Sequence, residues 1–124
     1  MRLLLAVALL AAVLPAGAQN WVGLLKNGPA ERFDEEDLRL FMDTARKALN
    51  EGADNQTTSW ENPKTKARGE VTVVRRFEWK KNPCRELKVH NEAQGRKGDS
   101  TFNLCQVEGK WRLLSSSQVP KKQP

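Results

Sequence analysis

The sequence predicts an α+β fold in which one N-terminal amphipathic helix packs on a four- to five-stranded antiparallel sheet that carries one disulfide. Three observations support this prediction. Apolar residues recur every three to four positions between Asp34 and Gly52, they alternate with polar residues in segments after Gly69, and the two cysteines flank one predicted hairpin. A helix followed by strands with short connections is typical of a helix covering one face of an antiparallel sheet.

The first 18 residues have the pattern of a secretory signal peptide. A basic start precedes an apolar run at 3–14 and the small residues Ala16, Gly17 and Ala18. Twelve apolar residues are fewer than the roughly 20 that a membrane-spanning helix needs. We therefore expect a signal peptide at 1–18, cleavage after Ala18, and an exported mature chain without a transmembrane segment.

The remaining chain has the length of a single domain. Cleavage after Ala18 leaves 106 residues, enough for one modest core. We expect an N-terminal segment at 19–32, the α+β domain at 33–116, and a disordered tail at 117–124 because "SSSQVPKKQP" shows no apolar periodicity.

The strongest local signal is the predicted helix. Asp34 is the expected N-cap, with acidic residues at 35–37 in the first turn, where the helix dipole favours them, and Gly52 is expected to end the helix. Its apolar residues fall on one stripe that we expect to face the core. They are Leu38, Phe41, Met42, Ala45, Ala48 and Leu49.

After the helix the apolar period changes from 3.6 to 2. The segment Gly69–Trp79 predicts a strand with four apolar side chains on one face, interrupted by Val74 and Arg75, which break the alternation. The four are Val71, Val73, Phe77 and Trp79. Further strands are expected at 57–60, 85–91, 100–107 and 110–115.

The two cysteines predict a structural disulfide. In an exported chain an even number of cysteines favours a disulfide, with a free or regulatory thiol pair as the alternative. If Cys84 faces Cys105 in an antiparallel hairpin, the turn falls at Gln94-Gly95, where turn residues stand. This register places four apolar side chains on the side away from the cysteines. They are Leu87, Val89, Phe102 and Leu104.

An ordered series of motifs runs through the second half of the chain: W-x-N-P, a following Gly, C-R-E, a second Cys and G-x-W. It lies in two stretches, "SWENPKTKARGEVTVVRRFEWKKNPCRELKVHN" and "FNLCQVEGKWRLLS". This series resembles the C-terminal domain of the bacterial 17 kDa surface antigen family over about residues 57–115. The matching residues are Trp60, Asn62, Pro63, Gly69, Cys84, Arg85, Glu86, Cys105, Gly109 and Trp111. A structural role accounts for these residues, because they fall at expected turn and core positions. The alternative is that they bind a ligand.

The resemblance implies a place in the Gram-negative envelope more than a reaction. Lipidated members have a Cys at the signal cleavage site, whereas this chain has Gln19, and the glycine-zipper stretch of some members is missing. The resemblance therefore implies a non-lipidated variant in the periplasm or at the cell surface. Our leading functional hypothesis for such a chain is a binding or structural protein.

Catalytic and metal-binding motifs are missing from the sequence. His90 is the only imidazole, and we expect it on the polar side of the hairpin, with no nucleophile arranged around it. A zinc site would require more Cys and His ligands than the chain has. We expect no catalytic residue, no cofactor and no metal. An envelope enzyme is therefore a weaker hypothesis than a binding or structural protein, or than an inhibitor or interaction module for one acidic protein.

Charge is unevenly distributed along the chain. Residues 19–63 hold 5 basic and 9 acidic residues, whereas residues 64–124 hold 15 basic and 6 acidic ones. A basic sheet face could contact an anionic envelope polymer or, as the alternative, one acidic protein partner that the chain inhibits or binds. Nucleic acid is not expected, because we expect the chain to be exported and Phe77 and Trp79 to be buried. The candidate residues of this face are Arg76, Lys88, Arg96 and Lys97.

Overall fold

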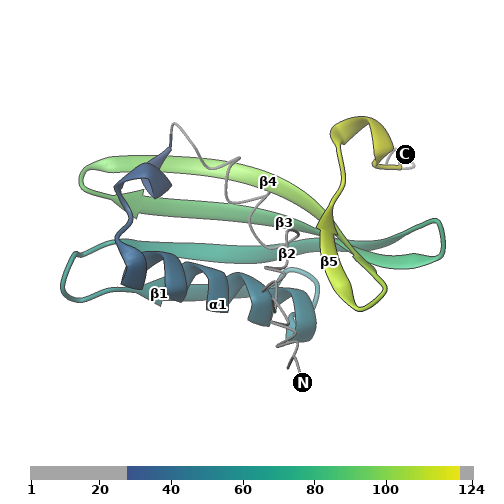
Figure 1. The fold of residues 1–124 in the computed structure, drawn as a ribbon, viewed down its shortest axis with the longest axis horizontal. Coiled ribbons are helices and arrows are strands. Elements are labelled where there is room, and N and C mark those ends of the chain that lie inside the picture. Colours follow the sequence, from purple (N-terminus) through teal and green to yellow (C-terminus); the bar gives the residue numbers. More distant parts are fainter. Residues whose placement is uncertain (1–27, 121–124) are drawn as a thin grey trace, which may run out of the picture.

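The structure is a computed structural model that describes residues 28–120. Five antiparallel strands form one sheet in the order β1-β2-β3-β4-β5, and one long helix lies against it (Figure 1). The predicted α+β class is confirmed. The predicted signal peptide and residues 19–27 lie outside the described residues. The elements are η3 (Pro29–Arg32), α1 (Glu35–Glu51), β1 (Thr57–Glu61), β2 (Arg68–Trp79), β3 (Asn82–Ala93), β4 (Arg96–Val107), β5 (Lys110–Leu113) and η4 (Ser116–Gln118).

Helix α1 begins and ends at the predicted caps. The Asp34 carboxylate accepts a hydrogen bond from the N–H of Asp37, and the Asp37 carboxylate accepts one from the N–H of Asp34, so the capping box is complete. Gly52 follows the last helical residue and donates its N–H to the Ala48 carbonyl. The helix therefore lies at Glu35–Glu51, after the short turn η3, and not at the N-terminus of the chain as the fold prediction placed it.

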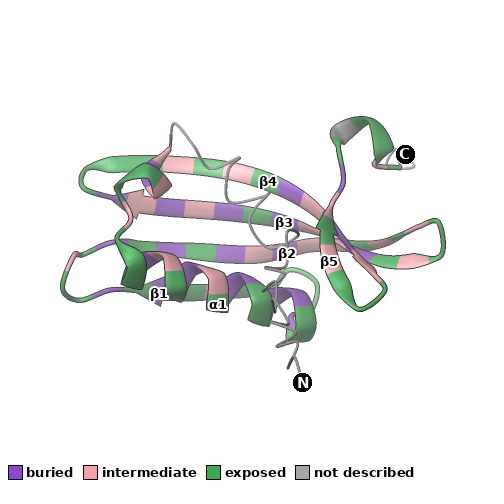
Figure 2. Ribbon diagram, viewed as in Figure 1, coloured by how far each residue is buried: buried purple, intermediate pink, exposed green. Residues whose placement is uncertain are grey.

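The main core lies between α1 and one face of the sheet, here called the helix side. Buried and exposed residues alternate along the strands, and α1 turns its buried stripe toward them (Figure 2). Apolar burial of this kind is the dominant contribution to folding free energy. The largest members of this core are Phe41, Leu49, Trp60, Val71, Val73, Leu87, Val89, Phe102 and Leu104.

A bulge in β2 corrects one sequence prediction. Val73 pairs with Leu87, but Arg75 pairs with Glu86, so Val74 is an extra residue in β2. An extra residue reverses which face the following side chains occupy. Val71 and Val73 therefore lie on the helix side as predicted, whereas Phe77 and Trp79 lie on the opposite face, here called the open side; their predicted place beside the valines is wrong.

The β3–β4 hairpin has the predicted register. Cys84 pairs with Cys105, the two are joined by a disulfide, and their Cα atoms are 4.0 Å apart. The turn is Gln94-Gly95, in which both residues have positive φ. The disulfide lies on the open side, because the apolar residues that alternate with its two cysteines point into the main core.

A second, smaller apolar group surrounds the disulfide. Cys84, Cys105 and Leu114 are buried in it, and four partly buried side chains pack against them. These seven residues are called the disulfide cluster below. We expect the disordered tail to begin at residue 117, and the structure describes its first four residues. One of them, Val119, follows η4 and packs in this cluster, so the start of the predicted tail packs against the domain. The four partly buried members are Phe77, Trp79, Val107 and Val119.

Candidate functional site

The W-x-N-P residues connect the β1–β2 loop to the start of α1. Asn62 is 3% exposed, and its side-chain amide donates to the Asp37 carboxylate at 2.7 Å. Thr65 donates its hydroxyl to the same carboxylate oxygen at 2.6 Å. Trp60 is buried in the main core, and Pro63 is an exposed turn residue that follows Asn62. These contacts give the motif a structural role at the N-terminus of the helix.

Arg85 of C-R-E and Trp111 of G-x-W contact the other end of the helix. Arg85 donates to the Leu49 carbonyl at 2.5 Å, which places a cation at the C-terminus of α1, whose own last turn has none. The Trp111 indole donates to the Asn50 side chain at 3.0 Å. Glu86 lies on the open side, 3.6 Å from Arg75, and Gly109 occupies the β4–β5 turn at a φ of 77°.

The four predicted cations do not form one face. Arg76 and Arg96 lie on the helix side, at 3.2 Å from Asp54 and 3.0 Å from Glu31 respectively, whereas Lys88 and Lys97 lie on the open side. Lys97 lies 3.7 Å from Glu92. Lys88 alone of the four forms no ion pair within residues 28–120. The sequence grouped these residues because it could not show the bulge or the acidic partners.

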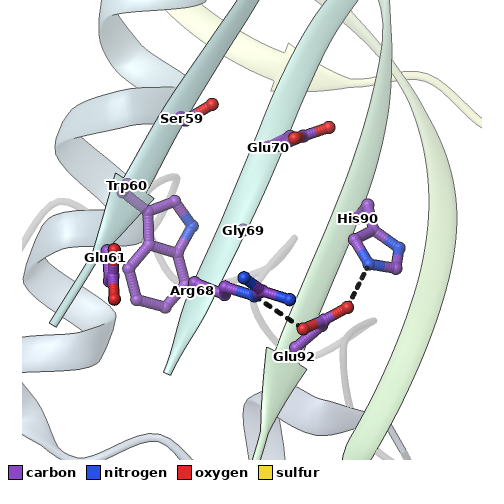
Figure 3. Close-up of a pocket in the computed structure, with 8 residues that line it drawn as sticks. All are labelled: Ser59, Trp60, Glu61, Arg68, Gly69, Glu70, His90 and Glu92. Carbon is purple, nitrogen blue, oxygen red and sulfur yellow. Dashed lines mark hydrogen bonds and ion pairs between the residues drawn. The ribbon is translucent and has the colours of Figure 1, made fainter. Parts of the chain in front are cut away.

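A polar groove of about 580 Å³ opens beside β1, β2 and β3 on the open side (Figure 3). His90 lies between two carboxylates: its Nδ1 is 2.8 Å from Asp99, and its Nε2 is 3.1 Å from Glu92. Arg68 donates to the other oxygen of Glu92 at 2.7 Å. The lining residues are Ser59, Trp60, Glu61, Arg68, Gly69, Glu70, His90 and Glu92.

The charges in this groove stabilise one another. Hydrogen bonds to Glu92 and Asp99 raise the pKa of His90 above its ordinary value, although partial burial opposes this. Hydrogen bonds from Arg68 and His90 lower the pKa of Glu92 to about 2. Because carboxylates occupy both ring nitrogens, the imidazolium form is favoured and neither nitrogen is free to accept a proton from a substrate.

We expect the contribution of His90 to stability to depend on pH. Its raised pKa means that the stabilisation is fully present below about pH 6.5 and is lost as the pH rises through the folded-state value. Urea unfolding of the protein and of His90→Gln should therefore show a difference in unfolding free energy that is largest near pH 5.5 and shrinks toward about pH 9. Lys88→Gln, on the same strand and side, is the control and should give a nearly constant difference. A constant difference for His90→Gln would contradict the assigned geometry.

A group of unpaired cations lies at the opposite end of the open side, around the disulfide cluster. Lys80 and Lys81 form the β2–β3 turn, while Lys110 and Arg112 pair with Val107 and Cys105 across β4–β5. All four cations are exposed, and none forms an ion pair with any of residues 28–120. These four residues are called the cationic end below. The sequence prediction missed them, although two adjacent lysines between two strands were a visible signal.

No family model, curated protein or solved structure matches the chain. Within residues 28–120 no helix has the length and apolar character required to cross a membrane.

Proposed function

We propose that the chain is an exported protein of the Gram-negative envelope, in the periplasm or at the cell surface, that acts by binding an anionic envelope polymer. The observation that carries this proposal is the cationic end. Its four cations are exposed and form no ion pair within residues 28–120, and the Lys80 Nζ lies 4.6 Å from the centre of the Trp79 ring. Phosphate-rich polymers such as lipopolysaccharide are attracted to such a surface. The proposal moves the contact from the four residues named by the sequence to Lys80, Lys81, Lys110 and Arg112.

The membership of the 17 kDa surface antigen family, as a non-lipidated variant, is part of the same proposal. Its support is the ordered motif, whose residues make contacts at both ends of α1 and along the sheet. A binding role rather than catalysis is supported by His90, because Glu92 and Asp99 hold both of its ring nitrogens. Export is supported by the Cys84–Cys105 disulfide, since such bonds persist in oxidising compartments.

Binding to purified lipopolysaccharide tests the proposal. The protein should bind the immobilised polymer at low ionic strength and lose affinity steeply as salt rises, because exposed charges are screened. Lys110→Glu with Arg112→Glu should weaken binding at least tenfold, since it reverses two unpaired charges of the cationic end. Arg96→Glu with Lys97→Glu is the charge-matched control at the opposite hairpin and should bind nearly as well as the unmodified protein. Equal losses in the two variants, or no binding by the unmodified protein, would exclude this function.

A second candidate is an interaction module or inhibitor for one acidic protein partner. The observation that favours it is the pair of partly buried aromatic residues, Phe77 and Trp79, beside the cations, because apolar contacts persist when salt screens charges. Retention of a single partner from envelope extract at moderate salt, without lipopolysaccharide binding, would favour this candidate over the first.

A further inference from the structure

The three two-residue turns of the sheet use different residues for the same backbone shape. In each turn both residues have positive φ: 49° and 64° at Lys80-Lys81, 48° and 78° at Gln94-Gly95, and 52° and 77° at Glu108-Gly109. The last two turns place glycine second, as such hairpins favour. The β2–β3 turn has lysine at both positions.

Lysine at positive φ is unfavourable for the fold. A Cβ makes the left-handed region unfavourable, whereas glycine populates that region readily. Asn-Gly is the pair that this turn geometry favours most. Lys80 and Lys81 therefore stand where local stability favours other residues, and such sites occur where the side chains serve binding.

The surroundings of the turn fit a membrane interface. Trp79 is half-buried in the disulfide cluster, and the Lys80 Nζ lies 4.6 Å from the centre of its ring. Beside it the Arg75 guanidinium lies 4.7 Å from the centre of the Phe77 ring. Tryptophan and lysine are the residues that prefer the boundary between water and lipid, because each combines an apolar part with a polar end.

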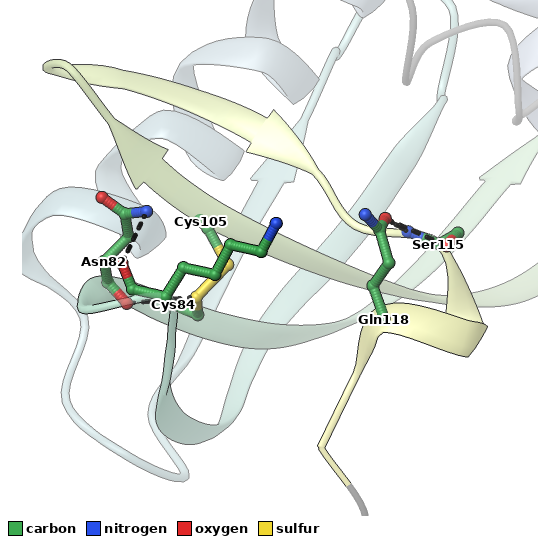
Figure 4. The surroundings of a disulfide bond; sticks show 6 residues. Asn82, Cys84, Cys105, Ser115 and Gln118 are labelled. Carbon is green, nitrogen blue, oxygen red and sulfur yellow. Dashed lines mark hydrogen bonds between the residues drawn. A yellow bond between two sulfur atoms is a disulfide. The ribbon is translucent and has the colours of Figure 1, made fainter.

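The turn is also exposed, and the disulfide lies close to its base. The β2–β3 hairpin projects beyond the end of α1, so its tip is clear of the helix (Figure 1). The disulfide joins β3 to β4 two residues after Asn82, at the base of the turn (Figure 4). A projecting tip with a cross-link near its base loses less conformational freedom on contact with a flat surface than a free loop would.

We propose that the tip formed by Trp79, Lys80 and Lys81 docks on the surface of an anionic lipid bilayer, with the lysines on headgroup phosphates and the indole at the interface. This inference rests on the proposed function, because it uses the same cationic end, and it adds the bilayer surface as a ligand. Lipid is favoured over a dissolved polymer because the Trp79 ring, which lies under the Lys80 ammonium, adds an apolar part to the cationic tip. Each lysine near such a surface strengthens binding about fivefold.

The test replaces the lysine pair by the residues that the turn favours, Lys80→Asn with Lys81→Gly. This variant should unfold at higher urea concentration than the unmodified protein, because the strained residues are gone. It should nevertheless bind vesicles of phosphatidylglycerol and phosphatidylcholine roughly 30-fold more weakly in a sedimentation assay. Higher stability combined with weaker binding cannot arise from misfolding.

Two controls separate charge from turn chemistry. Lys64→Asn with Lys66→Gly removes two lysines from the β1–β2 loop and places glycine at a φ of 67°, and it should bind vesicles nearly as well as the unmodified protein. Gln94→Asn creates the favoured Asn-Gly pair in the β3–β4 turn without changing charge, and this variant should bind vesicles as well as the unmodified protein. Equal binding by the β2–β3 turn variant and the unmodified protein would overturn the inference.

The vesicle assay also distinguishes this inference from the proposed function. Binding to lipopolysaccharide but not to phosphatidylglycerol vesicles would overturn the lipid inference and leave the proposed function intact. Binding to neither would overturn both. Addition of anionic vesicles should shift tryptophan fluorescence to shorter wavelength, and Trp79→Phe should lose most of that shift; an unchanged shift would place another surface at the lipid.

Discussion

Replacement of both cysteines, Cys84→Ala with Cys105→Ala, should lower the free energy of unfolding by about 3 kcal/mol. The disulfide joins residues that are 21 positions apart, so it limits the conformations of the unfolded chain across the whole β3–β4 hairpin. Both cysteines are almost fully buried, and alanine leaves part of their volume empty. Guanidinium unfolding followed by circular dichroism measures the difference.

Reductant provides the matched control for this prediction. The unmodified protein in reductant should approach the stability of the double alanine variant, whereas the variant itself should not respond. If full reduction leaves the unfolding midpoint of the unmodified protein unchanged, the disulfide does not stabilise the fold as described.

Gly69→Ala should lower the free energy of unfolding by about 3 kcal/mol, at the upper end of what overpacking usually costs. Gly69 lies between Trp60 on β1 and Asn91 on β3. A Cβ at this position would come within 2.6 Å of both the His90 carbonyl oxygen and the Trp60 Nε1, and closer still to the Asn91 side chain. A backbone oxygen within the sheet cannot move aside without disturbing the ladder, so urea unfolding should detect a large loss.

Gly95→Ala is the control for Gly69→Ala. No atom lies within 4 Å of a Cβ at Gly95, but the residue has a φ of 78°. Alanine there should cost roughly 1 kcal/mol from backbone strain alone. A loss at Gly69 no larger than the loss at Gly95 would contradict the close packing assigned to the motif glycine.

The hairpin shows how much of the fold the sequence specifies. Placing Cys84 opposite Cys105 predicted both the turn at Gln94-Gly95 and a shared face for Leu87 and Phe102, and the structure has both. Two independent constraints, disulfide geometry and apolar alternation, required the same register. The caps of α1 were predictable for a similar reason, because Asp34 and Gly52 bound one apolar stripe.

The bulge at Val74 shows where this reasoning fails. Alternation assigns faces only while each residue has one partner, and an extra residue reverses every later assignment in the strand. Val74 and Arg75 had already broken the pattern, yet the sequence alone offered no way to choose between a bulge and an irregular strand. As a result, alternation wrongly assigns Phe77 and Trp79 to the main core, and the aromatic part of the argument against nucleic-acid binding does not hold.

The candidate site was harder to predict than the fold. Ion pairs depend on residues far apart in the sequence, such as Glu31 with Arg96, so counting cations along the chain cannot show which remain unpaired. The pair of carboxylates around His90 also comes from two different strands. What the sequence did contain was the Lys80-Lys81 pair directly after Trp79, at a turn position where glycine or asparagine is favoured.

We propose that the chain is exported and that the Cys84–Cys105 bond then holds it in the fold that positions the cationic end. Intact mass measurement of the protein from its host, alkylated without reductant, tests this claim most directly. The account predicts a chain that begins at Gln19 and carries no alkyl group. A chain that retains residues 1–18, or that carries alkyl groups on both cysteines, would contradict it.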